Sequence, residues 1–227
     1  MPKAKIDGVT LYYEEAGSGT PIVFVHEFAG DYRSWEAQLR CFSGRYRAVT
    51  YSQRGYLPSD VPEQPEQYSQ EHLIEDLKGL LAHLKIERAH LCGLSMGSYT
   101  TLLFGLKHPT LARSLTIAGS GYGSGGNRAD FHARVRETSD RMLREGMPAI
   151  AQPYTLSPTR VQLQNKNPRG WEEFRRQFEE HSARGSALTL RGVQAQRPSI
   201  TELGPQLERL ALPALVILGD EDDPGIE

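Results

Sequence analysis

A serine between two glycines is the feature of this chain that points most directly to chemistry. Ser95 is the middle residue of the stretch 93–97 (Gly-Leu-Ser-Met-Gly), which follows the largely apolar run 89–92 and precedes a segment with helical spacing. This order predicts a strand-to-helix turn that exposes the serine oxygen. A side chain in place of either glycine would collide with the crossing strand and helix. Such a hydroxyl can attack a carbonyl group when a base accepts its proton and hydrogen-bond donors stabilise the oxyanion.

Strand-like and helix-like segments alternate around this turn. The pattern predicts strands at 4–6, 9–13, 21–26, 47–51, 88–92 and 114–118, with helices at 32–42, 69–84 and 96–107. The pair Asp7-Gly8 joins the first two strands in a hairpin, because it tolerates the positive φ angles of a tight turn. The later strands are apolar throughout and separated by helices, which indicates a parallel sheet covered on both faces. The predicted fold class is therefore α/β, with a mostly parallel, doubly wound sheet.

The regular alternation stops at Gly119. Residues 120–200 are richer in Arg, Gln, Gly and Pro and contain amphipathic pieces, among them an aromatic stripe of Trp171, Phe174 and Phe178. We expect a helical lid here, with the stripe packing on the main domain, contacting substrate, or doing both. The predicted organisation is a core of residues 1–119, a lid of residues 120–200, and a return to the core over residues 201–227 through a helix at 201–210 and a strand at 213–218.

Charge and hydropathy exclude several kinds of partner. The 26 basic and 28 acidic residues are mixed along the chain without a basic stripe that could neutralise phosphates, so no nucleic acid partner is expected. The longest apolar runs, 22–25 and 212–218, are too short to span a bilayer, and the N-terminus has no apolar signal core. Cys41 and Cys92 have no pairing or metal-ligand spacing and are predicted to be buried free thiols. These features predict a cytoplasmic protein that uses no membrane, metal or cofactor.

With its parts in this order, the chain resembles the α/β-hydrolase family. The resemblance extends from the first hairpin through Asp223 and implies that family's fold. Four motifs carry it: the loop 26–30 (His-Glu-Phe-Ala-Gly), the stretch 53–56 (Gln-Arg-Gly-Tyr) followed by Ser59-Asp60, the serine turn 93–97, and Gly219-x-x-Asp222 after the expected strand 213–218.

The resemblance also implies the first parts of a site. Ser95 is then the nucleophile, and the backbone N–H groups of Phe28 and Met96 form the oxyanion hole. Glu27 stands where the family usually has glycine, and we expect its carboxyl to point away from the site because an unpaired charge in a closed site is costly. Tyr122 and Phe28 are the first candidates for residues that line the substrate pocket.

The orienting acid and the general base come last in the family. Asp222 matches the position of the acid, whereas Asp220 and Asp223 are expected to shape the turn or face solvent. The resemblance places the catalytic histidine after the acid and one further strand, and none of the seven histidines of this sequence stands there. His26 belongs to the oxyanion loop, where a structural role is expected. A lid histidine that swings onto the serine is the alternative.

The expected strand 213–218 would form a long apolar edge of the sheet. Such an edge invites pairing with another strand or another chain. We therefore expect a fold that is incomplete at its C-terminus, in a parent protein longer by about 35 to 50 residues that include the catalytic histidine. Self-association through the same edge would give a homo-oligomer.

The function implied by the resemblance is hydrolysis of a small ester, lactone or related carbonyl compound. The reaction would pass through an acyl-enzyme intermediate, as in carboxylesterase-like serine hydrolases, and would need no cofactor. Epoxide hydrolases and haloalkane dehalogenases of this fold have a carboxylate in the place of Ser95, so the serine favours acyl chemistry or hydrolytic carbon–carbon cleavage. The alternative from a different class is a small-molecule-binding protein of this fold without catalysis.

Overall fold

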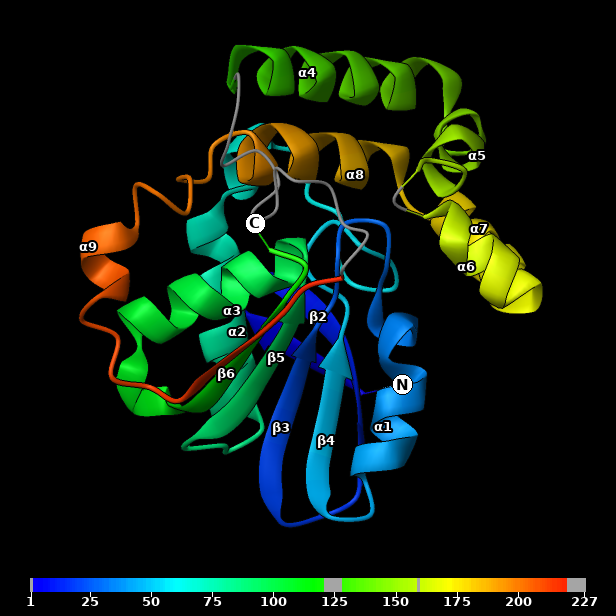
Figure 1. Ribbon diagram of the computed structural model, residues 1–227. Coiled ribbons are helices and arrows are strands. Elements are labelled where there is room, and N and C mark those ends of the chain that lie inside the picture. Colours follow the sequence, from blue (N-terminus) through cyan, green and yellow to red (C-terminus); the bar gives the residue numbers. More distant parts are fainter. Residues whose placement is uncertain (1, 121–127, 159, 220–227) are drawn as a thin grey trace.

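The computed structural model describes residues 2–120, 128–158 and 160–219 (Figure 1). Its strands are β1 (Lys3–Ile6), β2 (Val9–Ala16), β3 (Thr20–Val25), β4 (Tyr46–Tyr51), β5 (Ala89–Leu94), β6 (Ala112–Ala118) and β7 (Ala214–Ile217). They form a seven-stranded sheet in the order β1-β2-β4-β3-β5-β6-β7. β2 pairs antiparallel with β1 and with β4, and the remaining pairs are parallel. The mostly parallel α/β sheet predicted from the sequence is confirmed.

Helices lie on both faces of the sheet and beyond one of its ends. They are α1 (Glu36–Phe42), α2 (Gln70–His83), α3 (Met96–Lys107), α4 (Arg128–Glu145), α5 (Pro148–Thr155), α6 (Val161–Lys166), α7 (Pro168–Glu179), α8 (Ala183–Thr189) and α9 (Gly204–Leu207). α4 packs against α8, and Figure 1 shows both beyond the carboxyl ends of the parallel strands. The described part of segment 128–194 is called the helical layer below.

The N-terminal hairpin turns where the sequence predicts it. Ile6 pairs with Val9, and the turn between them holds Asp7 at φ 41° and Gly8 at φ 85°. Both angles are positive, as a two-residue hairpin turn of this kind requires.

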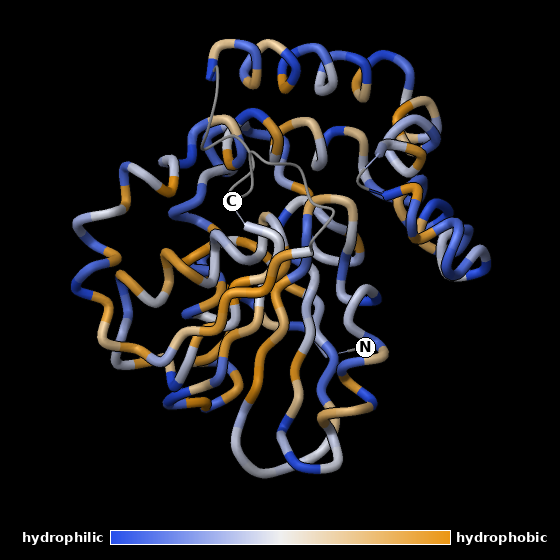
Figure 2. The backbone as a smooth tube through the Cα atoms, viewed as in Figure 1, coloured by the Kyte–Doolittle hydropathy of each residue, from blue (hydrophilic) through white to orange (hydrophobic). Residues whose placement is uncertain are grey.

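The two faces of the sheet carry separate apolar cores. Val23 and Val25 of β3 pack in a cluster with apolar residues of α2 and α3. The alternate residues Ile22 and Phe24 pack on the opposite face, where the ring of Phe24 stacks on that of Trp35 at a centroid distance of 5.0 Å. A strand that is apolar at every position therefore has cover on both sides, and Figure 2 shows hydrophobic residues along these central strands.

The predicted aromatic stripe lies on α7 and packs inside the protein. Phe178 is fully buried, with its ring centroid 4.9 Å from that of Tyr154 on α5 and 6.1 Å from that of Phe28. The indole N–H of Trp171 donates to the carbonyl oxygen of Thr155 at 3.0 Å. The stripe thus holds α5 against α7 and reaches the loop after β3.

The last described elements are shorter than predicted. The helix expected at 201–210 is limited to the four residues of α9. It begins no earlier because Pro205, in its first turn, has no N–H to continue a preceding turn. β7 has β6 as its one neighbour in the described part of the sheet, and Val216 is 61% exposed. The exposed apolar edge expected at this strand is present.

One cysteine prediction is wrong. Cys41 is exposed, because the short helix α1 places it on the outer side, and none of the seven residues of this helix is fully buried. Cys92 is half-buried on β5, and burial raises the pKa of its thiol to about 11. Within the described ranges no three His, Cys, Asp or Glu side chains gather as a metal site would require. No helix in those ranges combines the length and apolar character needed to cross a membrane.

Candidate active site

Ser95 occupies the turn between β5 and α3. Its backbone has φ 50° and ψ −112°, a conformation that residues other than glycine rarely adopt. The Ser95 N–H donates to the carbonyl oxygen of Ala118 at 2.8 Å, which fixes the turn to the end of β6. The side-chain hydroxyl has no hydrogen-bond partner among the described residues, so its oxygen is available for chemistry.

The two glycines allow three backbone segments to meet at this turn. A Cβ atom on Gly93 would overlap the carbonyl group of Gly97 and lie 2.6 Å from Oγ1 of Thr101. A Cβ atom on Gly97 would overlap the carbonyl group of Val25, at the end of β3. The steric requirement predicted from the motif is therefore present, and it brings the start of α3 against the loop after β3.

His26 is the first residue of that loop and is held by hydrogen bonds at both ring nitrogens. Nε2 accepts from the N–H of Gln53 at 3.0 Å, so the proton lies on Nδ1, which donates to the carbonyl oxygen of Glu27 at 2.7 Å. The side-chain amide of Gln53 donates to the His26 carbonyl oxygen at 3.0 Å. Burial lowers the pKa of His26 to about 4, so the ring is neutral. A histidine engaged in this way supports the loop and has no nitrogen left to serve as a base.

Phe28 and Met96 each have a backbone N–H at the end of the sheet that holds Ser95. The register pairs Val25 with Gly93, so the two residues follow neighbouring parallel strands at the same end of the sheet. Their side chains are buried in one apolar cluster. Neither N–H donates to an acceptor among the described residues. The N–H of Met96 also lies at the N-terminus of α3, where the helix dipole favours negative charge.

The motif at 53–56 anchors the next loop to α2. Arg54 donates from Nε and Nη2 to the two carboxylate oxygens of Asp76 at 2.6 and 2.7 Å, and both side chains are buried. Nη1 also donates to the carbonyl oxygen of Gln67 at 2.9 Å. The ring of Tyr56 packs edge-on against His26 with centroids 4.6 Å apart. The loops after β3 and β4 therefore support each other under the serine turn.

The fold that carries this arrangement is found in known proteins. Residues 20–224 match the model of the alpha/beta hydrolase fold. The chain belongs to the α/β-hydrolase fold family. Among solved structures, a thermophilic esterase from Thermogutta terrifontis is 27% identical and superposes with a TM-score of 0.85 over 96% of this chain and 80% of its own.

Two curated relatives match over shorter stretches. 3-Oxoadipate enol-lactonase 1 from Acinetobacter baylyi is 38% identical over 99 residues, which is 44% of this chain and 36% of the relative. Epoxide hydrolase 3 from Mus musculus is 30% identical over 120 residues, which is 52% of this chain and 33% of the relative. The matched region therefore spans only about a third of the length of these two relatives.

In this α/β-hydrolase, a charged cluster joins the loop after β3 to the helical layer. Asp31 accepts from Nε and Nη2 of Arg33 at 3.1 and 2.7 Å, and Nη1 of Arg33 donates to Glu180 at 2.6 Å. Nε2 of His181 lies 3.6 Å from Asp31. Burial alone would raise the pKa of Asp31, but the neighbouring His181 ring and the hydrogen bonds from Arg33 outweigh it and hold that pKa well below its usual range. This cluster was not predicted from the sequence, because Asp31 and Arg33 lie about 150 positions before Glu180 and His181.

Glu27 turns its side chain back over its own loop. Oε1 accepts from the hydroxyl of Ser34 at 3.2 Å, and Oε2 is buried without a hydrogen-bond partner among the described residues. Burial raises the pKa of this carboxyl. Glu27, which stands where the family usually has glycine, is thus a buried acid that directly precedes Phe28 in the chain.

The structure brings together three of the five predicted site residues. Ser95, Met96 and Phe28 lie at one end of the sheet, whereas Asp222 and Tyr122 fall outside the described residues. His181, one of the two histidines in the predicted lid, is buried beside Tyr56 and Phe178 and faces Asp31. No described histidine forms a hydrogen bond with the Ser95 hydroxyl.

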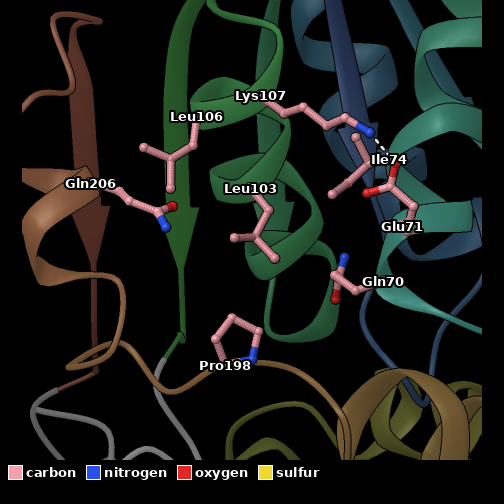
Figure 3. A pocket seen from close by; sticks show the side chains of 8 residues that line it. All are labelled: Gln70, Glu71, Ile74, Leu103, Leu106, Lys107, Pro198 and Gln206. Atoms are coloured by element: carbon pink, nitrogen blue, oxygen red, sulfur yellow. Dashed lines mark hydrogen bonds and ion pairs between the residues drawn. The ribbon is translucent and has the colours of Figure 1, made fainter.

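A hollow of about 280 Å³ lies between α2, α3 and the segment 198–206 (Figure 3). Figure 3 shows the apolar side chains of Leu103 and Leu106 facing it. The two charged residues of its lining, Glu71 and Lys107, pair with each other. This hollow shares no lining residue with the serine turn.

Proposed function

We propose that this chain is a serine hydrolase of small esters, lactones or related carbonyl compounds. The observation that carries the proposal is the turn of Ser95. Its hydroxyl has no partner, and the N–H groups of Phe28 and Met96, which follow the adjacent strands β3 and β5, have no acceptors among the described residues. Donors fixed in this way stabilise a tetrahedral oxyanion without reorganising during the reaction.

The proposed reaction has two halves. Ser95 attacks the substrate carbonyl carbon while a general base takes its proton, and the oxyanion accepts from the two N–H groups. Collapse of the tetrahedral species expels the leaving group and gives an acyl-enzyme, which water then hydrolyses through the same base. The proposal assigns the orienting acid to Asp222 and the base to a histidine beyond residue 227. An intact mass of the native protein above the 25.4 kDa of these residues would support that assignment, and equality would overturn it.

The proposal also covers the lid, the cellular location and the partners of the enzyme. Residues 120–200 would act as a lid over the serine and, with Tyr122, shape the substrate pocket. The protein would work in the cytoplasm on a small molecule, without a cofactor, nucleic acid or membrane partner. The exposed edge at β7 would allow a homo-oligomer.

The relatives support acyl chemistry to different degrees. The names enol-lactonase and esterase describe reactions at a carbonyl carbon, whereas the name epoxide hydrolase describes the opening of an epoxide ring. Serine in the nucleophile position favours the first kind, with hydrolytic carbon–carbon cleavage as a related outcome. A binding protein without catalysis is the second candidate, because no described histidine reaches Ser95.

Replacement of the nucleophile tests the proposal. In the full-length protein, Ser95→Ala is expected to lower kcat on a panel of p-nitrophenyl esters and simple lactones by at least about a thousandfold. Ser18→Ala, at an exposed turn, is the matched control and should keep wild-type turnover. A fluorophosphonate probe should label the wild-type protein at Ser95 and leave the Ser95→Ala variant unlabelled. Turnover that survives Ser95→Ala would overturn the mechanism, and ligand binding without turnover in any variant would favour the binding protein.

A further inference from the structure

Glu27 belongs to the peptide unit that carries one of the two proposed oxyanion donors. The carbonyl of Glu27 and the N–H of Phe28 are parts of the same planar trans peptide and point in opposite directions. The carbonyl oxygen accepts from Nδ1 of His26 at 2.7 Å and from the N–H of Gly30 at 3.2 Å. These two donors therefore fix the direction of the Phe28 N–H from the far side of the peptide plane.

The side chain of Glu27 closes the same loop. Its carboxyl lies over Gly30, where an added Cβ atom would come within 2.5 Å of Cδ of Glu27, and Oε1 accepts from the hydroxyl of Ser34. The carboxyl thus packs on the residue whose N–H holds the peptide. A change in the carboxyl is transmitted to the donor through Gly30.

The surroundings of the carboxyl favour its neutral form. Among the described residues no cation lies within ion-pair distance of Glu27, and Oε2 is buried without a partner. The charged and titratable groups that act on it are Asp31 on its own loop, Tyr56 on the loop after β4, and Arg160 at the start of α6. Arg160 is directed to the helical layer, where it donates to the Tyr154 hydroxyl at 2.7 Å.

The effects that raise the pKa of Glu27 are larger than those that lower it. Burial raises the pKa of Glu27, and the carboxylate of Asp31 adds to that effect. Its own backbone N–H, the Ser34 hydroxyl and the charge of Arg160 oppose it without cancelling it. Ionisation would leave a buried carboxylate oxygen unpaired next to a second carboxylate, which is costly, so the loop must rearrange when the proton leaves.

We propose that Glu27 is a positioning residue of the oxyanion hole, which as a neutral carboxylic acid holds the loop 26–31 in the shape that aims the Phe28 N–H at the substrate. This inference rests on the proposed hydrolase function. When Glu27 loses its proton, the loop relaxes, the donor turns away and turnover falls. The protonated acid is the active form, so kcat carries a falling limb as pH rises through the pKa of Glu27.

Two measurements on the full-length protein test this role. In a kcat–pH profile on an ester substrate, the wild-type protein should show a falling limb of about tenfold per pH unit, with little change in KM. Glu27→Gln, which cannot ionise, should lose this limb. The matched control Glu66→Gln, at an exposed position, should keep it. In addition, ¹³C NMR of carboxyl-labelled glutamate should show one resonance, missing in Glu27→Gln, that titrates well above the exposed glutamates and coincides with the kinetic limb.

The outcomes separate this inference from the proposed function. Turnover that depends on Ser95, with the same falling limb in Glu27→Gln as in the wild type, would overturn the role of Glu27 and leave the hydrolase intact. Absence of Ser95-dependent turnover would overturn the hydrolase, and the positioning role with it. A Glu27 resonance that titrates together with the exposed glutamates would overturn the neutral acid whatever the turnover.

Discussion

Two arginine–aspartate pairs flank the serine turn, and they differ in what surrounds them. Arg54 and Asp76 join the loop after β4 to α2, with side chains 1% and 2% exposed. Arg33 and Asp31 belong to the loop after β3, where Arg33 is 28% exposed and also contacts Glu180 of the helical layer. The Arg54–Asp76 pair is buried and forms no hydrogen bond or ion pair with the described part of the helical layer, whereas Arg33 of the other pair also contacts that layer through Glu180.

This difference in burial indicates that the two arginine–aspartate pairs have different structural roles. A fully buried pair is hard to break, because removal of one partner leaves a charge with neither water nor a counter-ion. In the other pair Asp31 is buried, but the partly exposed Arg33 can exchange a partner for water at smaller cost. We therefore infer that Arg54–Asp76 maintains the fold under the serine, whereas the cluster around Asp31 sets how the helical layer meets the loop after β3.

The largest expected effect comes from breaking the sealed pair. Asp76→Ala should lower the free energy of unfolding by about 3–5 kcal/mol, because Arg54 then holds a buried charge with only the Gln67 oxygens as acceptors. Urea denaturation followed by far-UV circular dichroism at pH 7 measures the loss. As a control, Glu36→Ala removes a pair with Arg40 whose side chains are 65% and 76% exposed, and should cost less than about 1 kcal/mol. Equal losses in the two variants would show that burial does not distinguish the pairs.

An intermediate effect is expected at the bridging cluster. Asp31→Asn keeps an acceptor for the Arg33 N–H, which bonds the side chain at 2.8 Å, but removes the charge that faces Arg33 and His181. The free energy of unfolding at pH 7 should fall by about 1–3 kcal/mol. The same urea titrations measure it.

The pH dependence of this variant gives a second check. Because the pKa of Asp31 is held below its unfolded value, its charge contributes stability above that unfolded value, about 3.9, and the contribution is lost as pH falls through the folded value. The difference between wild type and Asp31→Asn should therefore be full at pH 7 and shrink below about pH 4. A difference that stays constant into acid would contradict the charged state of Asp31.

The sheet and the serine turn could be predicted because short stretches of sequence determine them. Gly93 and Gly97 must lack side chains where β5, α3 and β3 meet, and no other residue type fits. The hairpin at Asp7-Gly8 and the two-sided apolar pattern of β3 are equally local signals. The placement of Phe28 and Met96 side by side follows from the parallel register of β3 and β5.

The remaining features depend on contacts between distant segments. Nothing near Asp31 in the sequence indicates that His181 will face it or that Glu180 will pair with Arg33, because the packing of α7 on the loop decides this. The buried state of Glu27 likewise depends on Gly30 and Ser34 folding beneath it. The exposure of Cys41 is set by which side of α1 faces the sheet.

The smallest expected effect separates the two halves of the bridging cluster. Glu180→Gln removes the ion pair with Arg33, whose side chains are 45% and 28% exposed, and a more exposed pair with Arg176 of α7. Arg33 keeps Asp31 as a partner through two nitrogens. The free energy of unfolding should change by less than about 1 kcal/mol, and added salt should reduce even that difference because the pair is screened. Urea titrations at low and high salt measure both values. A loss as large as that of Asp31→Asn would mean that the contact between the layers, rather than the aspartate within the loop, supplies the stability of the cluster.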